Sequence, residues 1–408
     1  MLTVAAALEQ LMATVLPLSL SEVPLEESLG LVLGEDVCSL GDIPPFDKSL
    51  MDGYAVRSTD VSSGIASLRV TENITAGRVP AKNVGAGEAA QIMTGAPLPV
   101  GADVVVKIEE TSRDGDHVFI KTLPPPAGTN ILLRGTIVRA GEHVLHAGLV
   151  LNGPRIGALA ELGRAVVSTR RRPEVAILAT GDELVPINES PGPAQIRNSN
   201  ASMLAAQIES AGGIPVSIGI ARDNRDELQR KIQQGLKCDV LVLSGGVSAG
   251  VLDLVPGTLA EMGVTEIFHK VEMKPGKPIW FGQRDKSRQI VDGNCRECFV
   301  FGLPGNPVSS LVCCELFVRT AIRRLMGVEP AIVPPILAKL EHDYSTRPDR
   351  PTYHPARLTW GAGGFAVRLV PWHGSSDLCG ISAANGMAYL SGEARQYRVG
   401  DELETFGW

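Results

Sequence analysis

Three glycine-rich segments combine hydroxyls, carboxylates and turn-forming residues in a way that suits the binding of phosphate groups. Their sequences are TGDEL at 180–184, SGGVSAG at 244–250 and GLPGNPVS at 302–309. Glycine lets the backbone turn its N–H groups closely toward an anion. One such segment is typical of an ordinary tight turn, but three in equivalent positions predict a phosphate pocket. Its candidate ligands are Ser244, Gly245, Gly246, Ser248, Gly305, Asn306, Pro307 and Ser309.

Acidic residues in and beside these segments could hold a divalent cation. Glu183 lies within the first segment, and Asp253 lies eight residues beyond Gly245. Mg²⁺ takes a few protein oxygens and completes its coordination with water or phosphate, so carboxylates beside a phosphate pocket suit it. A second interpretation of Asp253 is a cap at the start of the following helix.

A group of lysines follows the second segment. Lys270, Glu272 and Lys274 alternate, so a strand would place their side chains on one face, with Lys277 beyond a Pro-Gly turn. The ammonium groups are compact charges that could clamp an oxyanion. A solvated strand face is the alternative interpretation.

The elements that must hold these residues follow a repeated strand and helix pattern. Runs of Val, Ile and Leu alternate with helical patterns, the strands at 175–179, 215–220 and 240–243 and the helices at 199–211 and 225–234. Such runs are typical of parallel strands covered by helices on both faces, where ligands bind at the carboxyl ends of the strands. We therefore predict a central, doubly wound, mostly parallel α/β domain.

The flanking parts of the chain predict further domains. Short apolar runs broken by Gly and Pro are typical of β structure, and they occupy most of the rest of the chain. We predict an α/β multidomain protein with an N-terminal helical and linker domain at 1–44 and 140–172, a β-rich lobe at 45–139, the α/β domain at 173–328 and a C-terminal β-barrel-like domain at 329–408.

The composition is that of a folded protein without a dominant charge. The 408 residues include 38 basic and 45 acidic side chains, a net charge of −7, which argues against a nucleic-acid partner. No apolar run is long enough to span a membrane, and the first residues lack a signal-peptide pattern. Seven scattered cysteines are unlike a secreted disulfide framework. We expect a cytoplasmic protein with reduced thiols and no membrane partner.

Two further sets of potential metal ligands receive no metal in this interpretation. Cys295 and Cys298 form a CxxC pair, but the cysteines at 313 and 314 have the wrong spacing for a second zinc-binding pair, so a hairpin tip is preferred. His143 and His146 have no third ligand candidate nearby in the sequence.

Taken in order, the motifs of this chain resemble those of the molybdopterin molybdenumtransferase family, which includes the gephyrin E domain. Besides the three glycine-rich segments, the resemblance covers PPFDKSLMDGYA at 44–55, TGAPLPVGAD at 94–103 and KPGKP at 274–278. These six motifs extend the resemblance over nearly the whole chain.

The resemblance implies a reaction in which adenylylated molybdopterin and molybdate react with Mg²⁺ present, and AMP and the molybdenum cofactor are released. It implies that Glu183 and Asp253 bind the metal and that Asp223 acts with them in hydrolysis. The residues implied in oxyanion binding are Lys270, Lys274 and Lys277.

The resemblance also implies an elongated homodimer with an active site shared between subunits. Asp52, with a catalytic role, and Thr94 would come from the β-rich lobe of the partner subunit. Arg350 and Ser375 resemble ligand contacts from the C-terminal domain, and a role as surface-loop residues is the alternative. Molybdopterin adenylyltransferase and molybdoenzymes are the expected transient partners.

The sequence departs from the family pattern at several positions. Members usually read N-[IV]-R-x-x-G-E-D after a proline-rich break, whereas residues 130–137 read NILLRGTI and lack both carboxylates. Lys48 stands where Asn is usual, and Asn224 stands where many relatives have Asp. The missing carboxylates suggest one alternative, a catalytically weak scaffold that binds and delivers the pterin. A second alternative is an enzyme of the same mechanism that uses tungstate, because tungstate and molybdate nearly match in size and charge.

Overall fold

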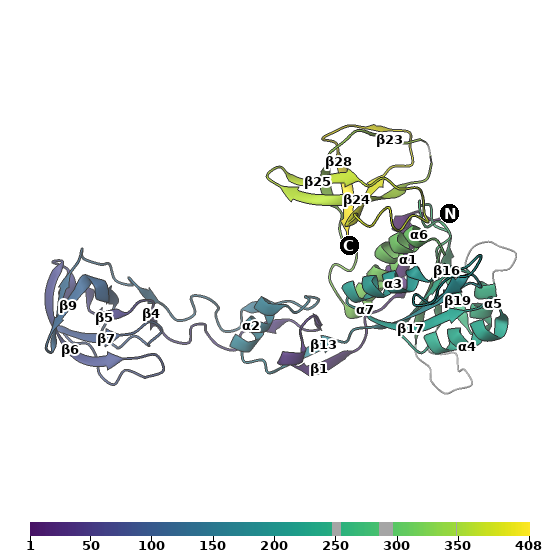
Figure 1. Cartoon of the computed structure of the whole chain (residues 1–408). Helices are drawn as coiled ribbons and strands as arrows, with labels where there is room; N and C mark the ends of the chain where they lie inside the picture. Colours follow the sequence, from purple (N-terminus) through teal and green to yellow (C-terminus); the bar gives the residue numbers. More distant parts are fainter. Residues whose placement is uncertain (247–253, 285–296, 348) are drawn as a thin grey trace. The chain divides into compact units, whose positions relative to one another are not determined.

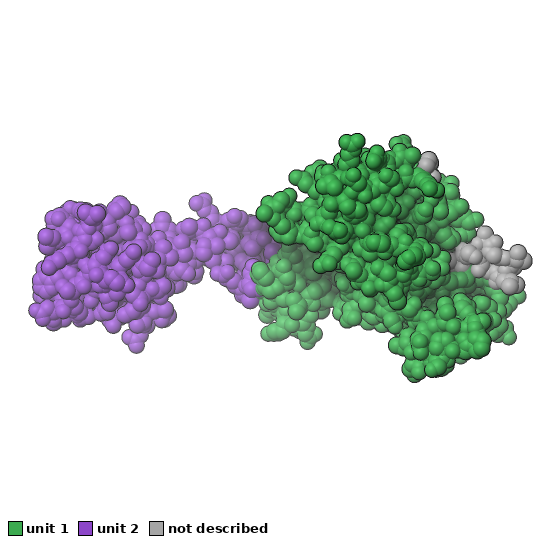
Figure 2. Space-filling view, turned by 45° about the horizontal axis from the view of Figure 1, so that its top comes forward, with its two compact units in different colours: residues 1–34, 148–156, 165–408 green, residues 35–147, 157–164 purple. Residues whose placement is uncertain are grey.

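In the computed structural model, which describes residues 1–246, 254–284, 297–347 and 349–408, the chain divides into two units. Unit 1 contains residues 1–34, 148–156 and 165–408, and unit 2 contains residues 35–147 and 157–164. Figure 1 labels the elements, and Figure 2 colours unit 1 green and unit 2 purple. No helix in the described ranges combines the length and the apolar character needed to cross a bilayer.

The centre of unit 1 is a six-stranded sheet with the strand order β17-β14-β18-β21-β20-β19. Its strands are β14 (Glu174–Thr180), β17 (Ile214–Ala221), β18 (Val240–Ser244), β19 (Val264–His269), β20 (Trp280–Arg284) and β21 (Cys298–Leu303). The first four in spatial order are parallel, and β20 and β19 add an antiparallel edge. The predicted mostly parallel sheet is confirmed.

Helices cover both faces of this sheet (Figure 1). On one face lie α3 (Ser199–Ser210), α6 (Pro307–Cys313) and α7 (Arg319–Met326), and on the other lie α4 (Arg225–Gly235) and α5 (Leu254–Glu261). Successive strand residues point to opposite faces. In β14, Val175 and Ile177 accordingly pack in the core on the side of α3, α6 and α7. Ala176 and Leu178 pack in the core on the side of α4 and α5. The doubly wound arrangement predicted from the sequence is therefore present.

The helix boundaries follow local capping chemistry. The side chain of Asn198 accepts a hydrogen bond from Ala201 N (3.2 Å), and that of Asn224 accepts one from Glu227 N (3.0 Å), so each caps the helix that it precedes. Helix α6 begins at Pro307, a residue suited to the first helical position, and continues into a π-helical segment, Cys314–Val318.

The segment from 270 to 274 differs from the prediction. Strand β19 ends at His269, and Lys270 has a φ of 66°, which interrupts an extended strand. The backbone N–H of Glu272 donates to Leu2 O (2.8 Å), and that of Lys274 donates to Pro351 O (2.8 Å). The backbone N–H groups at 270 and 271 donate locally, to Ile279 O and Lys277 O. The expected strand with Lys270, Glu272 and Lys274 on one face is therefore wrong, because the left-handed residue breaks the alternation and the segment is divided between local and distant partners.

A closed five-stranded barrel forms the C-terminal part of unit 1. Around the barrel the strands are β22 (Ile336–Leu340), β25 (Gly364–Leu369), β24 (Thr352–Gly361), β26 (Gly386–Leu390) and β28 (Glu402–Gly407). Alanines at 338, 356 and 388 are buried among leucines in its interior, and small side chains suit so narrow a barrel. The predicted C-terminal β-barrel-like domain is confirmed.

The remaining elements of unit 1 are short. The N-terminal helix α1 (Val4–Thr14) is capped by the side chain of Thr3. Three strands form a small sheet in the order β1-β13-β2, and the other elements complete the unit. Their bounds are β1 (Leu20–Pro24), β2 (Val32–Leu33), β13 (Val166–Arg170), β15 (Leu184–Val185), β16 (Ile196–Arg197), β23 (Tyr344–Ser345), β27 (Gln396–Tyr397) and the 3-10 helix Leu25–Glu27, with α2 (Gly153–Glu161) shared between the units.

Unit 2 is built on a six-stranded sheet with the order β8-β5-β7-β6-β10-β9. These strands are β5 (Gly53–Val56), β6 (Ile65–Ile74), β7 (Glu88–Ile92), β8 (Val104–Lys107), β9 (Thr111–Asp114) and β10 (His117–Lys121). Two strand pairs accompany the sheet, β3 (Val37–Cys38) with β12 (His143–Leu145) and β4 (Lys48–Ser49) with β11 (Ile131–Leu132), as do the 3-10 helices Ser58–Val61 and Ile108–Glu110. The predicted β-rich lobe is present, while the exact four-domain boundaries stay a prediction.

Candidate active site

A cavity of about 930 Å³ opens at the carboxyl ends of the parallel strands β14, β18 and β21. Each of the three glycine-rich segments contributes to its wall, as expected for ligand sites in sheets of this kind. Their lining residues are Thr180, Gly181, Glu183, Leu184, Ser244, Gly245, Gly246, Pro304, Gly305, Asn306 and Pro307. The structure therefore brings together segments that are more than a hundred residues apart in the sequence.

The glycines of the second segment permit a very close approach to strand β14. Gly245 has a φ of 96°, and a Cβ atom there would lie 2.7 Å from Thr180 O. Gly246 has a φ of 67°, and its Cβ would lie 2.8 Å from Thr180 Oγ1. Any other residue would be strained and would collide with Thr180. The backbone at this wall of the cavity therefore requires glycine.

Asn200, at the start of α3, links two of the segments. Its Nδ2 atom donates to Ser244 Oγ and to Gly305 O, both at 2.8 Å. Its Oδ1 atom and Thr180 Oγ1 are buried at the cavity and accept or donate no hydrogen bond within the described part of the chain. The sequence interpretation missed Asn200, because a single Asn in a helical pattern carries no signature of such a link.

Two of the predicted carboxylates line this cavity. Glu183 and Asp223 are both exposed lining residues, from the loops that follow β14 and β17. The Glu183 carboxylate lies back over Gly181, where a Cβ would come within 2.4 Å of its Oε2 atom. The guanidinium of Arg222 donates to Asp182 O (2.8 Å) and braces the same loop. Asp253 and Ser248 lie outside the described residues.

A turn of the C-terminal barrel completes the wall. Residues 376–379 line the cavity, and Asn306 Nδ2 donates to Ser375 Oγ at 3.0 Å. Asp377 accepts hydrogen bonds from the backbone N–H of His373 (3.0 Å) and of Gly380 (2.8 Å), and it contacts the His373 ring. These bonds, first that from the His373 backbone, hold the pKa of Asp377 below its ordinary value. The turn is thus fixed by an ionised carboxylate.

Comparisons with known proteins match the whole architecture. Sequence models of the "MoeA N-terminal region (domain I and II)", a "probable molybdopterin binding domain" and the "MoeA C-terminal region (domain IV)" match residues 2–163, 176–324 and 338–406. The chain is 35% identical to the molybdopterin molybdenumtransferase of Staphylococcus aureus, over 94% of this chain and 90% of that protein. This chain belongs to the molybdopterin molybdenumtransferase (MoeA) family.

Further relatives agree with this membership. The molybdopterin molybdenumtransferase of Staphylococcus epidermidis is 32% identical, over 99% of this chain and 95% of that protein. A crystal structure of a MoeA protein from Pyrococcus horikoshii superimposes with a TM-score of 0.82 at 28% identity, with all of both chains covered. The family resemblance and the α/β multidomain fold predicted from the motifs are confirmed, and the chain is a member of a transferase family of molybdenum cofactor biosynthesis.

The lysines that the resemblance assigns to oxyanion binding are outside the described cavity lining. Pro278 lines the cavity, but Lys270, Lys274 and Lys277 are not among its described lining residues. Lys274 Nζ instead forms an ion pair with Asp349 Oδ2 at 2.6 Å. This ion pair, as the first cause, lowers the pKa of Asp349. The predicted oxyanion role of the lysines stays a prediction.

Two other predicted ligands, Arg350 and Ser309, are not among the described residues that line the cavity. Arg350, next to Asp349, donates from its guanidinium to Met273 O at 3.0 Å, so it braces the lysine-bearing segment. Ser309 is buried within α6 and is not among the described cavity-lining residues. Neither contact tests a role in ligand binding.

In unit 2, the two residues assigned by the resemblance to the β-rich lobe lie together. Both the backbone N–H and the Oγ1 hydroxyl of Thr94 donate to Asp52 Oδ1, at 2.7 and 2.8 Å. These bonds lower the pKa of Asp52, the backbone bond most strongly, and keep the carboxylate ionised. Asp52 and Thr94 therefore form one exposed, negatively charged group.

The segment that departs from the MoeA pattern forms a braced turn. The guanidinium of Arg134 contacts Asp42 Oδ2 at 2.7 Å, and the backbone N–H of Arg134 donates to Asp47 Oδ1 at 2.7 Å. Thr136 Oγ1 donates to Leu133 O at 2.7 Å, within the turn. Thr136 and Ile137 thus occupy a structured turn, although they lack the expected carboxylates.

Four of the six cysteines in the described ranges are buried, whereas Cys38 is half-buried and Cys379 is exposed. Cys298, Cys313 and Cys314 are buried, and burial raises the pKa of the Cys313 and Cys314 thiols. Such thiols stay protonated and are poor metal ligands. Cys295 lies outside the described residues, so the CxxC interpretation stays a prediction.

Proposed function

We propose that this chain is a molybdopterin molybdenumtransferase that converts adenylylated molybdopterin and molybdate into the molybdenum cofactor and releases AMP. The observation that carries the proposal is the cavity in which three glycine-rich segments and two carboxylates meet. Both substrates are anions, and the chain as a whole is negatively charged. Local donors must therefore bind them, and Gly246 and the amide side chain of Asn306, which both line the cavity, would supply such donors.

The carboxylates beside these donors suit Mg²⁺. Glu183 and Asp223 line one cavity, and hard cations of this type prefer oxygen ligands combined with substrate phosphates. The two residues would hold the ion, which supplies positive charge against the phosphates when bound. Asp253 would join them. Asn200 links Ser244 to Gly305 by its own hydrogen bonds, which need no ion.

The proposal includes a homodimer in the cytoplasm whose active site takes Asp52 and Thr94 from the partner subunit. The pair is exposed and ionised, as expected for a group that acts on a ligand outside its own unit. The adenylyltransferase that makes the nucleotide-linked pterin and the molybdoenzymes that receive the product would be transient partners.

A pterin-delivery scaffold of low activity is the second candidate. The observation that favours it is the segment at 133–137, where Thr136 and Ile137 replace carboxylates that the family usually carries. A tungstate-using enzyme is a variant of the first candidate, because tungstate and molybdate have nearly the same size and charge.

The decisive experiment is incubation of the purified protein with adenylylated molybdopterin, molybdate and Mg²⁺. We expect stoichiometric release of AMP, lost on Glu183→Ala, while Glu189→Ala, a charge-matched change outside the cavity lining, keeps it. Binding of the pterin without AMP release would select the scaffold. Competition between molybdate and tungstate for product formation decides the preferred oxyanion.

A further inference from the structure

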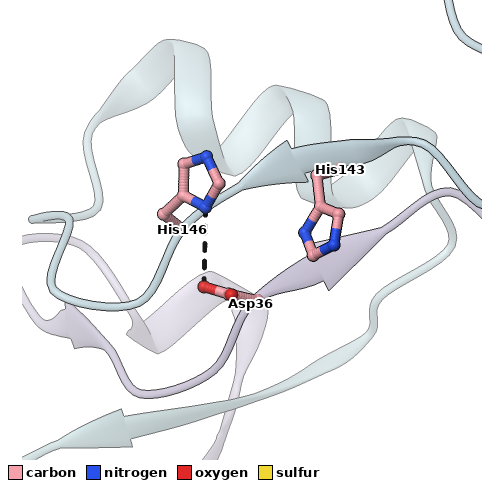
Figure 3. Close-up of side chains that lie close together, drawn as sticks. All are labelled: Asp36, His143 and His146. Carbon is pink, nitrogen blue, oxygen red and sulfur yellow. Dashed lines mark ion pairs between the residues drawn. The ribbon is translucent and has the colours of Figure 1, made fainter.

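Three potential metal ligands gather in unit 2, far from the cavity residues in the sequence. They are Asp36, His143 and His146, and one ligand atom of each lies within 4.8 Å of the other two (Figure 3). Asp36 Oδ1 is 3.6 Å from His146 Nδ1, and the two imidazole rings are stacked with centroids 5.9 Å apart. The sequence interpretation found no third ligand for the histidines, and the fold supplies it from a position 107 residues before His143.

The pairing of β3 with β12 creates this arrangement. His143 pairs with Cys38 and Leu145 pairs with Val37, with a register shift between them. Val37 and its partner Leu145 are buried on one side of the strand pair. Cys38 follows Val37 and so faces the opposite side, and the register shift lets its partner His143 share that exposed side. Asp36 directly precedes β3, and its Oδ1 atom accepts a hydrogen bond from Ala147 N at 2.8 Å. The carboxylate is thereby held next to His146.

We propose that Asp36, His143 and His146 form a binding site for a divalent transition-metal cation, with Zn²⁺ as the favoured ion. Zinc accepts imidazole nitrogen and carboxylate oxygen together, and three protein ligands with one water are a common set. With bonds of about 2.0–2.1 Å in tetrahedral geometry, ligand atoms lie roughly 3.4 Å apart. The carboxylate and the His146 nitrogen are already near that separation, and rotation of the exposed His143 ring completes the set.

Two other histidine and aspartate pairs in the described part of the chain lack this geometry. His117 contacts Asp116 at 2.8 Å, and His373 contacts Asp377 at 2.9 Å, as ordinary two-membered pairs. Within the described ranges, the Asp36 group is the one cluster of three or more such ligands. His117 is therefore a matched control for an exposed histidine beside a carboxylate.

The proposed role of the bound ion is structural: it would cross-link two distant segments of unit 2. The ion would join the backbone just before β3 to the end of β12, and it would close a loop of more than a hundred residues that contains the six-stranded sheet of unit 2. Closing a long loop restricts the unfolded chain, and metal that binds only the folded form stabilises it.

The test is a calorimetric titration of the full-length protein with Zn²⁺ at neutral pH, in excess Mg²⁺ to occupy the proposed site in unit 1. We expect the wild type and His117→Ala to bind one more zinc ion per chain than His143→Ala/His146→Ala. Asp36→Asn, which keeps an acceptor for Ala147 N, should weaken that site at least about tenfold. Equal zinc stoichiometry and affinity in the wild type and the double variant would overturn the proposal.

Thermal unfolding gives an independent readout that needs no activity. Zinc should raise the unfolding temperature of the wild type and of His117→Ala, and leave that of the double variant unchanged, while all three unfold alike without metal. A zinc-induced rise of the same size in the double variant would also contradict the site. Circular dichroism of the metal-free proteins confirms that the variants are folded.

Discussion

The side-chain amide of Asn200 holds two of the cavity-lining segments together, a role that its sequence context does not indicate. Asn200 joins Ser244 to Gly305 through two hydrogen bonds from one nitrogen. Hydrogen bonds of this kind are worth about 1 kcal/mol each. Their combined loss is enough to loosen two of the segments that line the cavity without unfolding the sheet.

We therefore expect Asn200→Ala to raise the KM for the adenylylated pterin roughly tenfold, since about 1.4 kcal/mol corresponds to that factor. The matched control is Asn385→Ala, which removes two comparable bonds to Leu358 in the barrel. Steady-state AMP release measures both variants. An identical KM in the two would show that Asn200 does not position the segments.

Asp377 makes the barrel turn sensitive to acid. Its pKa is lowered in the folded protein, so its stabilising effect is present above the unfolded pKa of about 4 and is lost as pH falls through the folded value. We expect the stability difference between the wild type and Asp377→Asn to be largest near neutral pH and to vanish on acidification below about pH 4. Urea unfolding at a series of pH values measures it, and a difference independent of pH would contradict this account.

At the scale of residues, the sequence predicted cavity residues where they belong to one contiguous motif. The three glycine-rich segments predicted Glu183, Ser244 and Asn306 at one pocket, and the cavity contains all three. Asn200 and the group of Asp36 with His143 were not predictable in this way, because their partners come from distant segments and only the folded backbone brings them together.

The elements differ in which substitutions of glycine they tolerate. Gly245 lies in the turn after β18 with a positive φ, and its added Cβ would meet Thr180 O. Gly257 lies within α5 with open space around it. The same substitution must therefore have opposite consequences in two neighbouring elements.

We expect Gly245→Ala to lower the free energy of unfolding by about 1–3 kcal/mol and to reduce AMP release strongly. Gly257→Ala should instead raise it by up to about 1 kcal/mol, because alanine favours the helix. Chemical denaturation of the two variants gives both values. Destabilisation by Gly257→Ala, or none by Gly245→Ala, would contradict the geometry.

Periodicity explains which elements could be foreseen. β14 and β18 are continuous apolar runs, and α4 has an N-cap and acidic first-turn residues, so local sequence specified them. The segment at 270–274 alternates like a strand, yet the left-handed φ of Lys270 and its distant backbone partners give it another shape. Alternation alone does not report such long-range pairing.

At the scale of the whole molecule, the proposed site needs residues from two subunits. Glu183 belongs to unit 1, and Asp52 belongs to unit 2. If each active site combines unit 1 of one subunit with unit 2 of the other, a mixed dimer of two inactive variants contains one intact site and one doubly altered site.

Mixing Glu183→Ala and Asp52→Ala proteins should therefore restore about a quarter of the wild-type activity, because random exchange makes half of the dimers mixed and half of their sites intact. Each variant alone, and a mixture before subunit exchange, are the controls. No recovery after demonstrated exchange would place both residues in the same subunit's site or remove Asp52 from it.

The closure of the C-terminal barrel has a consequence for the order in which the protein folds during its synthesis. Strand β28 pairs with both β22 and β26, so the barrel is complete only when residues 402–407 are in place. The turn that holds Ser375 and Asp377 against the cavity belongs to this barrel. While the chain grows on a ribosome, the finished pocket can therefore arise only after translation has passed the last strand.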